Sequence, residues 1–286
     1  MEEINLFNTY KNNIINIFPW KIGNILYCSY SNINNFKKML DENAFEIIET
    51  VWKKEKSRNI NRKYLYNGKL ARLSLLKVSP NRKNINLYTE LTNYKEYVGS
   101  RDILFKNYLK SIKKEIFSNP LGVSIVIETK DKKIIIGKRK KNETNSNFWY
   151  IPGGFIDPGK DVANSIININ KVIIRETTEE LGKVSFIKMK STGFSYDCKK
   201  PHPEIHFYGK TKEDSAKILK LAKKGEEFSE WAAVRANQDV ISKLLFDKKE
   251  KVLSAAGTAA IFLYGNYTFG SKWSRKNKNC IKGMIL

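Results

Sequence analysis

The feature that most constrains this chain is an acidic segment, 175–182, in which three glutamates recur at helical spacing. Glu176, Glu179 and Glu180 stand at i, i+3 and i+4, so a helix would place all three carboxylates on one face. Like charges at this spacing destabilise a bare helix, whereas hard divalent cations such as Mg²⁺ offset the repulsion and leave positions for phosphates and water. The segment therefore predicts a metal-binding helix that ends at Gly182.

The charge of the whole chain bears on this interpretation. It has 52 Lys and Arg residues against 29 Asp and Glu residues, a net charge of +23 in 286 residues. A solvated acidic face is the alternative, but a localised acidic triplet in so basic a chain favours the metal site. The basic balance itself favours nucleotides, nucleic acid or an anionic membrane face as partners, although biased genomic base composition also produces chains rich in Lys, Asn and Ile.

A pair of glycines precedes the acidic segment, in the sequence Trp149-x-x-Pro152-Gly153-Gly154. Adjacent glycines let a backbone carbonyl approach a metal or a phosphate that a Cβ would obstruct. The surrounding pattern predicts strands over 123–128, 134–139, 184–191 and 204–208, a helix over 162–181 and a second, small-residue helix over 255–263.

The glycine pair, the loop after it and the Arg-Glu-x-x-Glu-Glu-x-Gly helix resemble the Nudix box, Gly-x5-Glu-x7-Arg-Glu-U-x-Glu-Glu-x-Gly-U, in which U is apolar. The resemblance covers about residues 122–239. It implies an α+β protein with a Nudix α/β/α sandwich and a mixed sheet. It also implies a pyrophosphohydrolase that uses Mg²⁺, with Mn²⁺ as an alternative ion, on a nucleoside diphosphate linked to another moiety.

The resemblance also assigns roles to residues. It implies Glu176, Glu179 and Glu180 as the catalytic and metal-binding residues, and the Gly154 carbonyl as a further metal ligand. The expected substrate-binding residues are Lys138, Arg139 and Trp149. Many members add a carboxylate from a later loop, for which Glu226 and Glu227 rank above Glu230.

The chain departs from the box in three places. Lys160 stands where the box has its first glutamate, seven extra residues precede Arg175, and Lys183 holds the last apolar position. In the family the first glutamate chiefly supports the arginine. We therefore expect Asp157 or Asp161 to take that supporting role.

Residues 1–119 are expected to form a smaller α+β domain before a Nudix domain at 120–286 with a basic C-terminal tail. Helical spacing over 35–56 and 103–117 and a hairpin turning at Asn67-Gly68 into a strand over 70–78 support this expectation. The boundary is set at Pro120, which disfavours a helical conformation of the residue before it.

The substrate branch is a separate question. Segments 66–73, 90–99 and 200–207 resemble the branch that hydrolyses UDP-sugars to UMP and a sugar 1-phosphate. Two alternatives stay open: an RNA-end pyrophosphohydrolase or decapping enzyme, supported by the charge, and a non-catalytic nucleotide or RNA sensor, suggested by Lys160. The partner is thus a small nucleotide conjugate, with RNA as the alternative; the oligomeric state is not set by the sequence.

Other features suggest location and exclude further sites. Cys28, Cys198 and Cys280 are scattered, so neither a disulfide framework nor a zinc site is indicated, and a reducing cytoplasm is expected. No secretion signal is recognised, and the longest apolar stretch, 252–264, is too short to cross a bilayer, so no membrane partner is expected. His202 and His206 flank Glu204, but an alternating strand explains them better than a metal site does.

Overall fold

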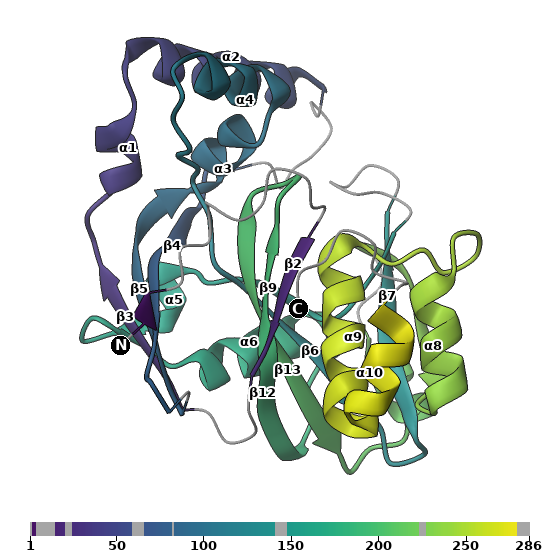
Figure 1. Cartoon of the computed structure of the whole chain (residues 1–286). Helices are drawn as coiled ribbons and strands as arrows, with labels where there is room; N and C mark the ends of the chain where they lie inside the picture. The colour runs from purple at the N-terminus through teal and green to yellow at the C-terminus, as the bar shows by residue number, and fades with distance from the viewer. Residues whose placement is uncertain are drawn as a thin grey trace.

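The computed structural model describes residues 2–3, 15–20, 25–58, 66–81, 83–140, 148–222 and 227–278. Two mixed sheets and the helices around them make up this part of the chain, which confirms the predicted α+β class (Figure 1). None of the helices in these ranges is long and apolar enough to span a membrane.

The larger sheet contains the strands expected after Pro120. Its strands are β2 (Ile15–Pro19), β6 (Gly122–Glu128), β7 (Lys133–Arg139), β8 (Trp149–Tyr150), β9 (Gly153–Phe155), β12 (Phe186–Asp197), β13 (His202–Thr211) and β14 (Phe228–Arg235). The main order is β14-β7-β6-β13-β12-β2, with β8 paired to β7 and β9 paired to β6. β13 runs parallel to β6, and every residue of β6 is buried, as expected for a continuous apolar run between two covering layers.

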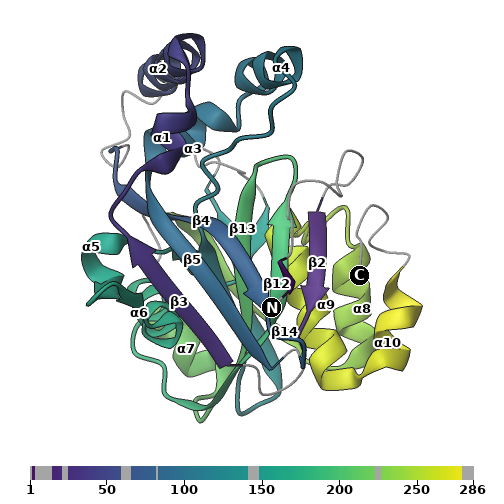
Figure 2. The same ribbon diagram turned by 60° about the vertical axis from the view of Figure 1, so that its left-hand side comes forward.

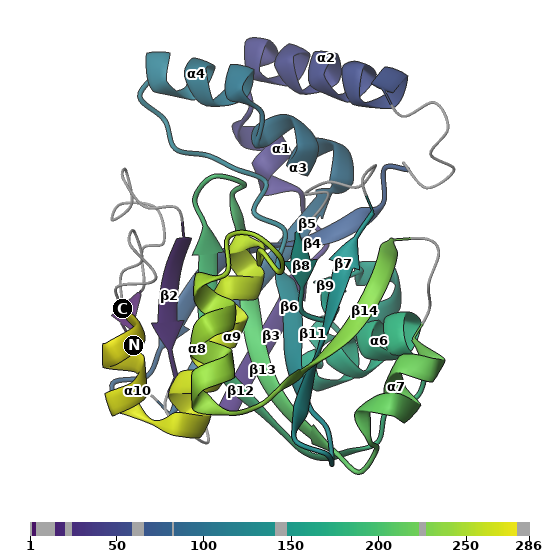
Figure 3. The ribbon, with the colours of Figure 1, turned by 90° about the vertical axis from the view of Figure 1, so that its right-hand side faces the viewer.

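Helices cover both faces of this sheet, as Figure 3 shows. One face packs against α9 (Ala255–Phe269), flanked by α8 (Gln238–Phe246) and α10 (Ser271–Asn277). The other face packs against α6 (Ile169–Leu181) and α7 (Ser215–Leu221). The predicted helix over 255–263 is confirmed and continues to Phe269, because its apolar residues are buried all round.

The smaller sheet is built mainly from residues before Pro120. Its strands are β1 (Glu2–Glu3), β3 (Ile25–Ser31), β4 (Lys69–Val78), β5 (Asn84–Asn93), β10 (Val162–Ala163) and β11 (Ile166–Ile167). They are ordered β1-β4-β5-β3-β11-β10, and Figure 2 shows β3, β5 and β4 side by side. The predicted strand over 70–78 is confirmed as part of β4, which pairs antiparallel with β5; residues 64 and 65 of the predicted hairpin lie outside the described residues.

Four further helices lie together at the end of the molecule drawn uppermost in Figure 3. They are α1 (Asn35–Met39), α2 (Glu42–Arg58), α3 (Tyr94–Ser100) and α4 (Ile103–Ser111). The prediction of a single helix over 35–56 is wrong in one respect, because the helix is interrupted after Met39. The Asp41 side chain then accepts a hydrogen bond from the Ala44 amide and so starts α2. The helix predicted over 103–117 ends early, at Ser111.

The prediction of one helix over 162–181 is also wrong. Residues 162–167 form a hairpin, β10–β11, whose turn residues Asn164 and Ser165 have φ values of 51° and 59°. A third strand stabilises it, because Ile166 pairs with Ser29 of β3 and the Tyr30 amide donates to the Ser165 carbonyl at 2.9 Å. The short helix α5 (Pro158–Asp161) precedes this hairpin. The extra residues of the box therefore join the smaller sheet instead of lengthening α6.

Each of the two parts of the chain, before and after Pro120, contributes strands to the sheet formed mainly by the other. β2 pairs with β12 in the larger sheet, while β11 pairs with β3 in the smaller one. The domain boundary at Pro120 remains a prediction.

Candidate active site

Helix α6 buries one side in the core and carries the three glutamates on the other, where Glu179 is exposed and Glu176 and Glu180 are partly buried. It begins at Asn168, whose side chain accepts from the Lys171 amide at 3.2 Å, and ends at Gly182, where φ is +76°. Its apolar residues Ile169, Val172, Ile173 and Leu181 lie in the core between the sheets. The carboxylates of Glu176 and Glu180 consequently face the glycine pair on β9.

The glycines are required by close contact with these carboxylates and with the sheet. A Cβ on Gly154 would lie 2.4 Å from Oε2 of Glu176, and a Cβ on Gly153 would lie 2.1 Å from the Val123 carbonyl oxygen. The Gly153 amide donates a hydrogen bond of 3.1 Å to Oε2 of Glu180. Any side chain at Gly154 would therefore displace the Glu176 carboxylate.

Arg175 organises the acidic cluster. Its guanidinium donates to both carboxylate oxygens of Asp161, at 2.8 Å from Nε and 2.6 Å from Nη2. Nη1 lies 2.8 Å from Oε1 of Glu176 and 3.3 Å from Oε2 of Glu179. Asp161 is thus the carboxylate that supports the arginine, one of the two residues expected from the sequence.

The second expected residue, Asp157, has a different role. Its side chain accepts from the Gly159 amide at 2.8 Å and so starts α5. That turn brings Asp161, at the end of α5, back toward α6, and Oδ2 of Asp161 accepts from the Asp157 amide. Lys160, at the position of the missing glutamate, lies 3.3 Å from Glu179.

Burial makes two of the carboxylates hard to ionise. The pKa of Glu176 is raised to about 7, first by burial and further by Glu179, although Arg175 opposes the shift. Burial also raises the pKa of Glu180 well above its ordinary value, with Glu227 and Glu176 adding to the effect and Arg139 opposing it. Burial, more than the neighbouring glutamates, thus favours the protonated form of these two side chains.

Glu227, one of the late-loop glutamates considered in the sequence analysis, stands directly before β14 and lies close to Glu180. Its Oε2 lies 2.9 Å from Nη1 of Arg139, at the end of β7. Arg139 is held between the Tyr150 and Phe228 rings, with its guanidinium carbon 4.9 and 5.2 Å from their centroids. Glu226 lies outside the described residues, and Glu230 is exposed on β14 opposite Lys138.

The structure places the remaining predicted substrate-binding residues around Trp149. The Trp149 side chain is in the core, with the residue 3% exposed, and its indole N–H donates to the Glu250 carbonyl at 3.2 Å. Lys138 is partly buried, with Nζ 5.9 Å from the Trp149 ring centroid. Substrate contact by these residues remains a prediction.

The donor set suits a hard divalent cation. Across the described ranges, no three His, Cys, Asp or Glu side chains are already arranged to hold a metal ion. The carboxylates are instead paired with basic side chains: Glu176 with Arg175, Glu179 with Lys160, and Glu227 with Arg139. A metal ion would compete with these side chains for the carboxylates. The carboxylates of Glu176 and Glu180 have raised pKa values and lie beside Gly154, which has no side chain of its own to shield its backbone. This set of oxygen donors fits Mg²⁺ or Mn²⁺.

A buried polar network lies on the opposite face of β6, and sequence reasoning missed it. His206 is fully buried, with Nδ1 2.8 Å from the Ser124 hydroxyl and Nε2 2.7 Å from the Ser195 hydroxyl. Glu204 lies 3.0 Å from Nε2 of His202. The alternation of polar residues at 202, 204 and 206 indicated a shared face, but nothing in the sequence indicated the two serines.

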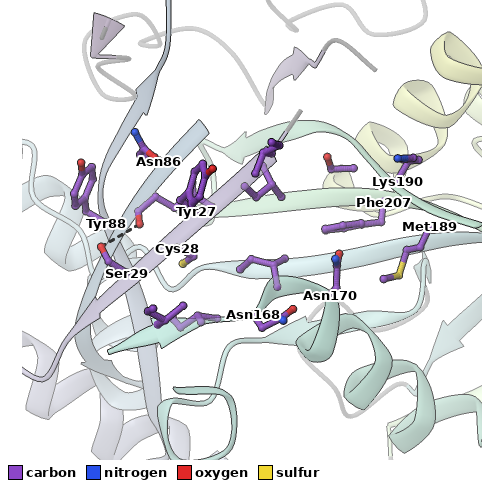
Figure 4. Close-up of a pocket in the computed structure, with 17 residues that line it drawn as sticks. Tyr27, Cys28, Ser29, Asn86, Tyr88, Asn168, Asn170, Met189, Lys190 and Phe207 are labelled. Carbon is purple, nitrogen blue, oxygen red and sulfur yellow. Dashed lines mark hydrogen bonds between the residues drawn. The ribbon is translucent and has the colours of Figure 1, made fainter. Parts of the chain in front are cut away.

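A cavity of about 700 Å³ lies away from the carboxylates, between β3, the start of α6 and β12. Figure 4 shows Tyr27 and Tyr88 on its side toward the smaller sheet, and Met189 and Phe207 on its side toward the larger one. The cavity is not part of the carboxylate site, because it meets α6 only at Ile169 and Asn170.

Comparisons with known proteins identify the relatives of this chain. The NUDIX domain family model matches residues 118–254. An RNA pyrophosphohydrolase of Pelagibacter ubique (strain HTCC1062) is 31% identical over 123 residues, which is 38% of this chain and 72% of that protein. Among solved structures, a Nudix hydrolase from Nitrosomonas europaea is 21% identical, with a TM-score of 0.37, over 52% of this chain and 90% of that one.

A MutT protein from Methanosarcina mazei is 18% identical, with a TM-score of 0.34, over 55% of this chain and 94% of that one. The domain match includes Gly154, Arg175 and the three glutamates of α6, the same residues that meet in the structure. With a relative above 30% identity that is matched over most of its length, the conclusion is direct: this chain belongs to the Nudix hydrolase family.

Proposed function

We propose that the protein is a Mg²⁺-dependent pyrophosphohydrolase that cleaves a phosphoanhydride bond at the 5′ end of RNA. The observation that carries the chemistry is the pair of shielded carboxylates, Glu176 and Glu180, that lie against the glycine pair, with the exposed Glu227 close to Glu180. The RNA substrate is supported by the similarity to the Pelagibacter RNA pyrophosphohydrolase and by the net charge of +23.

The residues around the glycine pair would bind the metal, position the carboxylates and accept a proton. Glu176, Glu179, Glu180 and Glu227, with the Gly154 carbonyl, would hold the metal, which when bound neutralises the phosphoanhydride and stabilises the leaving phosphate. Arg175 keeps the Glu176 carboxylate against Gly154, and Asp161 keeps Arg175 in place. Glu176 is the candidate to accept the proton of the attacking water.

UDP-sugar hydrolysis is the second candidate, because it follows from the resemblance of segments 66–73, 90–99 and 200–207. In the structure, Nη1 of Arg72 lies 2.5 Å from Oε1 of Glu90, and both residues are buried. Glu96 accepts hydrogen bonds from Asn34 and Thr92. Contacts within the protein therefore explain the residue types at Arg72, Glu90 and Glu96 without a bound sugar. We accordingly favour the RNA substrate.

The location proposed for this activity is the cytoplasm. Cys28 and Cys198 are free thiols, which suits a reducing compartment.

The test is a substrate panel with the full chain and Mg²⁺. It compares 5′-triphosphorylated RNA, capped RNA, UDP-glucose, ADP-ribose and a dinucleoside polyphosphate, each assayed for released products with and without a chelator. The proposal predicts the highest kcat/KM on an RNA 5′ end and no turnover after chelation. A higher kcat/KM on UDP-glucose would make the second candidate the function, and RNA binding without turnover of any substrate would favour a sensor.

A further inference from the structure

Three basic side chains meet where α3, α4 and the turn between β12 and β13 come together, and Figure 1 shows that turn beside α3. Arg101 follows α3, Lys106 lies in α4 and Lys200 lies in the turn; all three are partly buried. Nζ of Lys106 donates a hydrogen bond to the Lys199 carbonyl. The Arg101 guanidinium carbon lies 4.7 Å from the centroid of the Tyr97 ring.

Carboxylates offset this basic cluster, which we define as Arg101, Lys106 and Lys200, only from a distance: Glu55 acts on Arg101, and Asp197 acts on the two lysines. Asp197 is a buried carboxylate close by, but its Oδ1 accepts the Lys199 and Lys200 backbone amides at 2.8 and 2.9 Å. Within the described part of the chain, no residue of the cluster forms an ion pair with a carboxylate at 4.0 Å or less.

The neighbouring charges act on one another. Burial and then the proximity of Arg101 lower the pKa of Lys200 to about 8, and burial lowers the pKa of Lys106. Asp197 opposes both shifts without cancelling them. An anion placed among the three side chains would relieve this repulsion, so the arrangement is complementary to a phosphate.

The basic cluster lies beside the glycine strand but on its other side. The Phe155 ring, next in sequence to Gly154, is 5.3 Å from the Tyr97 ring and 5.6 Å from the His202 ring. Successive residues of a strand point to opposite faces, and Gly154 faces Glu176. An anion held by Arg101 is therefore a different group from the phosphate that reacts at Glu176.

We propose that Arg101, Lys106 and Lys200 bind a backbone phosphate of an RNA chain whose 5′ end reaches the carboxylates of α6. This inference rests on the proposed function and adds to it a contact with the chain downstream of the reacting end. The guanidinium and the two ammonium groups supply the positive charge for this contact.

Direct binding gives the first test. The probe is a fluorescent 5′-hydroxyl oligoribonucleotide, which carries no reactive anhydride, with anisotropy measured over a range of salt concentrations. K106Q/K200Q should raise the Kd about tenfold and lower the salt slope of log K by about 0.7 or more, since one phosphate contact is lost. The matched control, K220Q/K243Q, removes the same charge from exposed positions on α7 and α8 and should change Kd little.

Equal Kd values for K106Q/K200Q and its control would overturn the inference. Circular dichroism checks that the double variant folds. The single variant K200E, in the turn between β12 and β13, provides an independent loss of positive charge at the same place. K200E should weaken RNA binding at least as much as the double variant.

Kinetics separates this contact from the reacting phosphate. K106Q/K200Q should raise KM for 5′-triphosphorylated RNA while leaving its kcat, and the KM of a nucleoside triphosphate, unchanged. An equal rise for the mononucleotide would overturn the inference, because the cations would then serve the reacting end. If the wild-type chain does not hydrolyse RNA ends, the proposed function fails, whereas the binding measurement still decides whether the cluster holds RNA.

Discussion

Arg175 binds Asp161 through two hydrogen bonds, and Asp161 stands seven residues after Gly154, one position beyond the acidic residue of the usual box. Both oxygens of the carboxylate are engaged, and the remaining guanidinium nitrogen lies against Glu176. The shift of one position is made possible by α5, which turns the chain directly before Asp161. The altered box therefore retains a carboxylate that pairs with the arginine of α6.

Asp161→Asn should lower kcat/KM about 10- to 100-fold, because a neutral amide cannot hold the arginine with two charge-assisted hydrogen bonds. The measurement is turnover of the best substrate in the panel, with thermal unfolding to confirm the fold. Lys160→Gln, one residue earlier, removes only an exposed ion pair and should retain most of the activity. Comparable losses in the two variants would show that Asp161 does not support the site.

Gly154→Ala should reduce turnover about tenfold or more while the chain still folds. The added Cβ would lie 2.4 Å from Oε2 of Glu176, so the carboxylate must leave its position. Gly122→Ala is the matched control, since its Cβ would meet nothing closer than the Glu204 side chain at 3.4 Å. Wild-type rates in Gly154→Ala, measured at saturating Mg²⁺, would contradict the close contact.

Acid should destabilise the fold through His206. Burial lowers its pKa to about 4, from 6.5, so below pH 6.5 the unfolded chain binds a proton that the folded chain does not. The free energy of unfolding should fall as the pH drops from about 6.5 to 4, by up to about 1.4 kcal/mol per pH unit from this group. Glu204, with its pKa lowered to about 2, extends the loss from pH 4.5 downward.

Urea unfolding over this pH range measures the effect. His206→Gln should flatten the dependence between pH 6.5 and 4, because the substituted side chain does not titrate. His202 has a raised pKa from its contact with Glu204, so its contribution is present at low pH and is lost as the pH rises through that pKa. His202→Gln should therefore remove a loss of stability that the wild type shows as the pH rises above 6.5, and an unchanged dependence above pH 6.5 would count against the assignment.

Local pattern predicted β6, β7, β12 and β13 of the larger sheet, the helix α9 and the C-terminal part of the helix predicted over 162–181, since apolar runs such as that of β6 and the helical spacing before Gly182 depend on near neighbours in sequence. The hairpin at 162–167 was missed because its apolar residues also fit a helix, and its partner strand, β3, lies far away in sequence. Asn168, which caps α6, was the local signal that could have placed the start of the helix correctly.

The candidate site shows the same limit. The glutamates of α6 and the glycine pair follow from spacing, whereas the approach of Arg139 to Glu227 depends on how β7 pairs with β14. The core position of Trp149 depends on the segment before α9, whose Val252 and Glu250 carbonyls accept its backbone and indole N–H groups. Pairings of this kind require the fold.

The most direct test of the central claim, that the carboxylates beside the glycine pair drive metal-dependent hydrolysis, is a Mg²⁺ titration of turnover on 5′-triphosphorylated RNA by the wild-type chain and by Glu180→Gln. The account predicts that wild-type turnover rises from zero with Mg²⁺. It also predicts that the variant, folded and still able to bind RNA, is slower by about two or more orders of magnitude at every concentration. Turnover by Glu180→Gln equal to that of the wild type, or wild-type turnover that persists without a divalent cation, would contradict it.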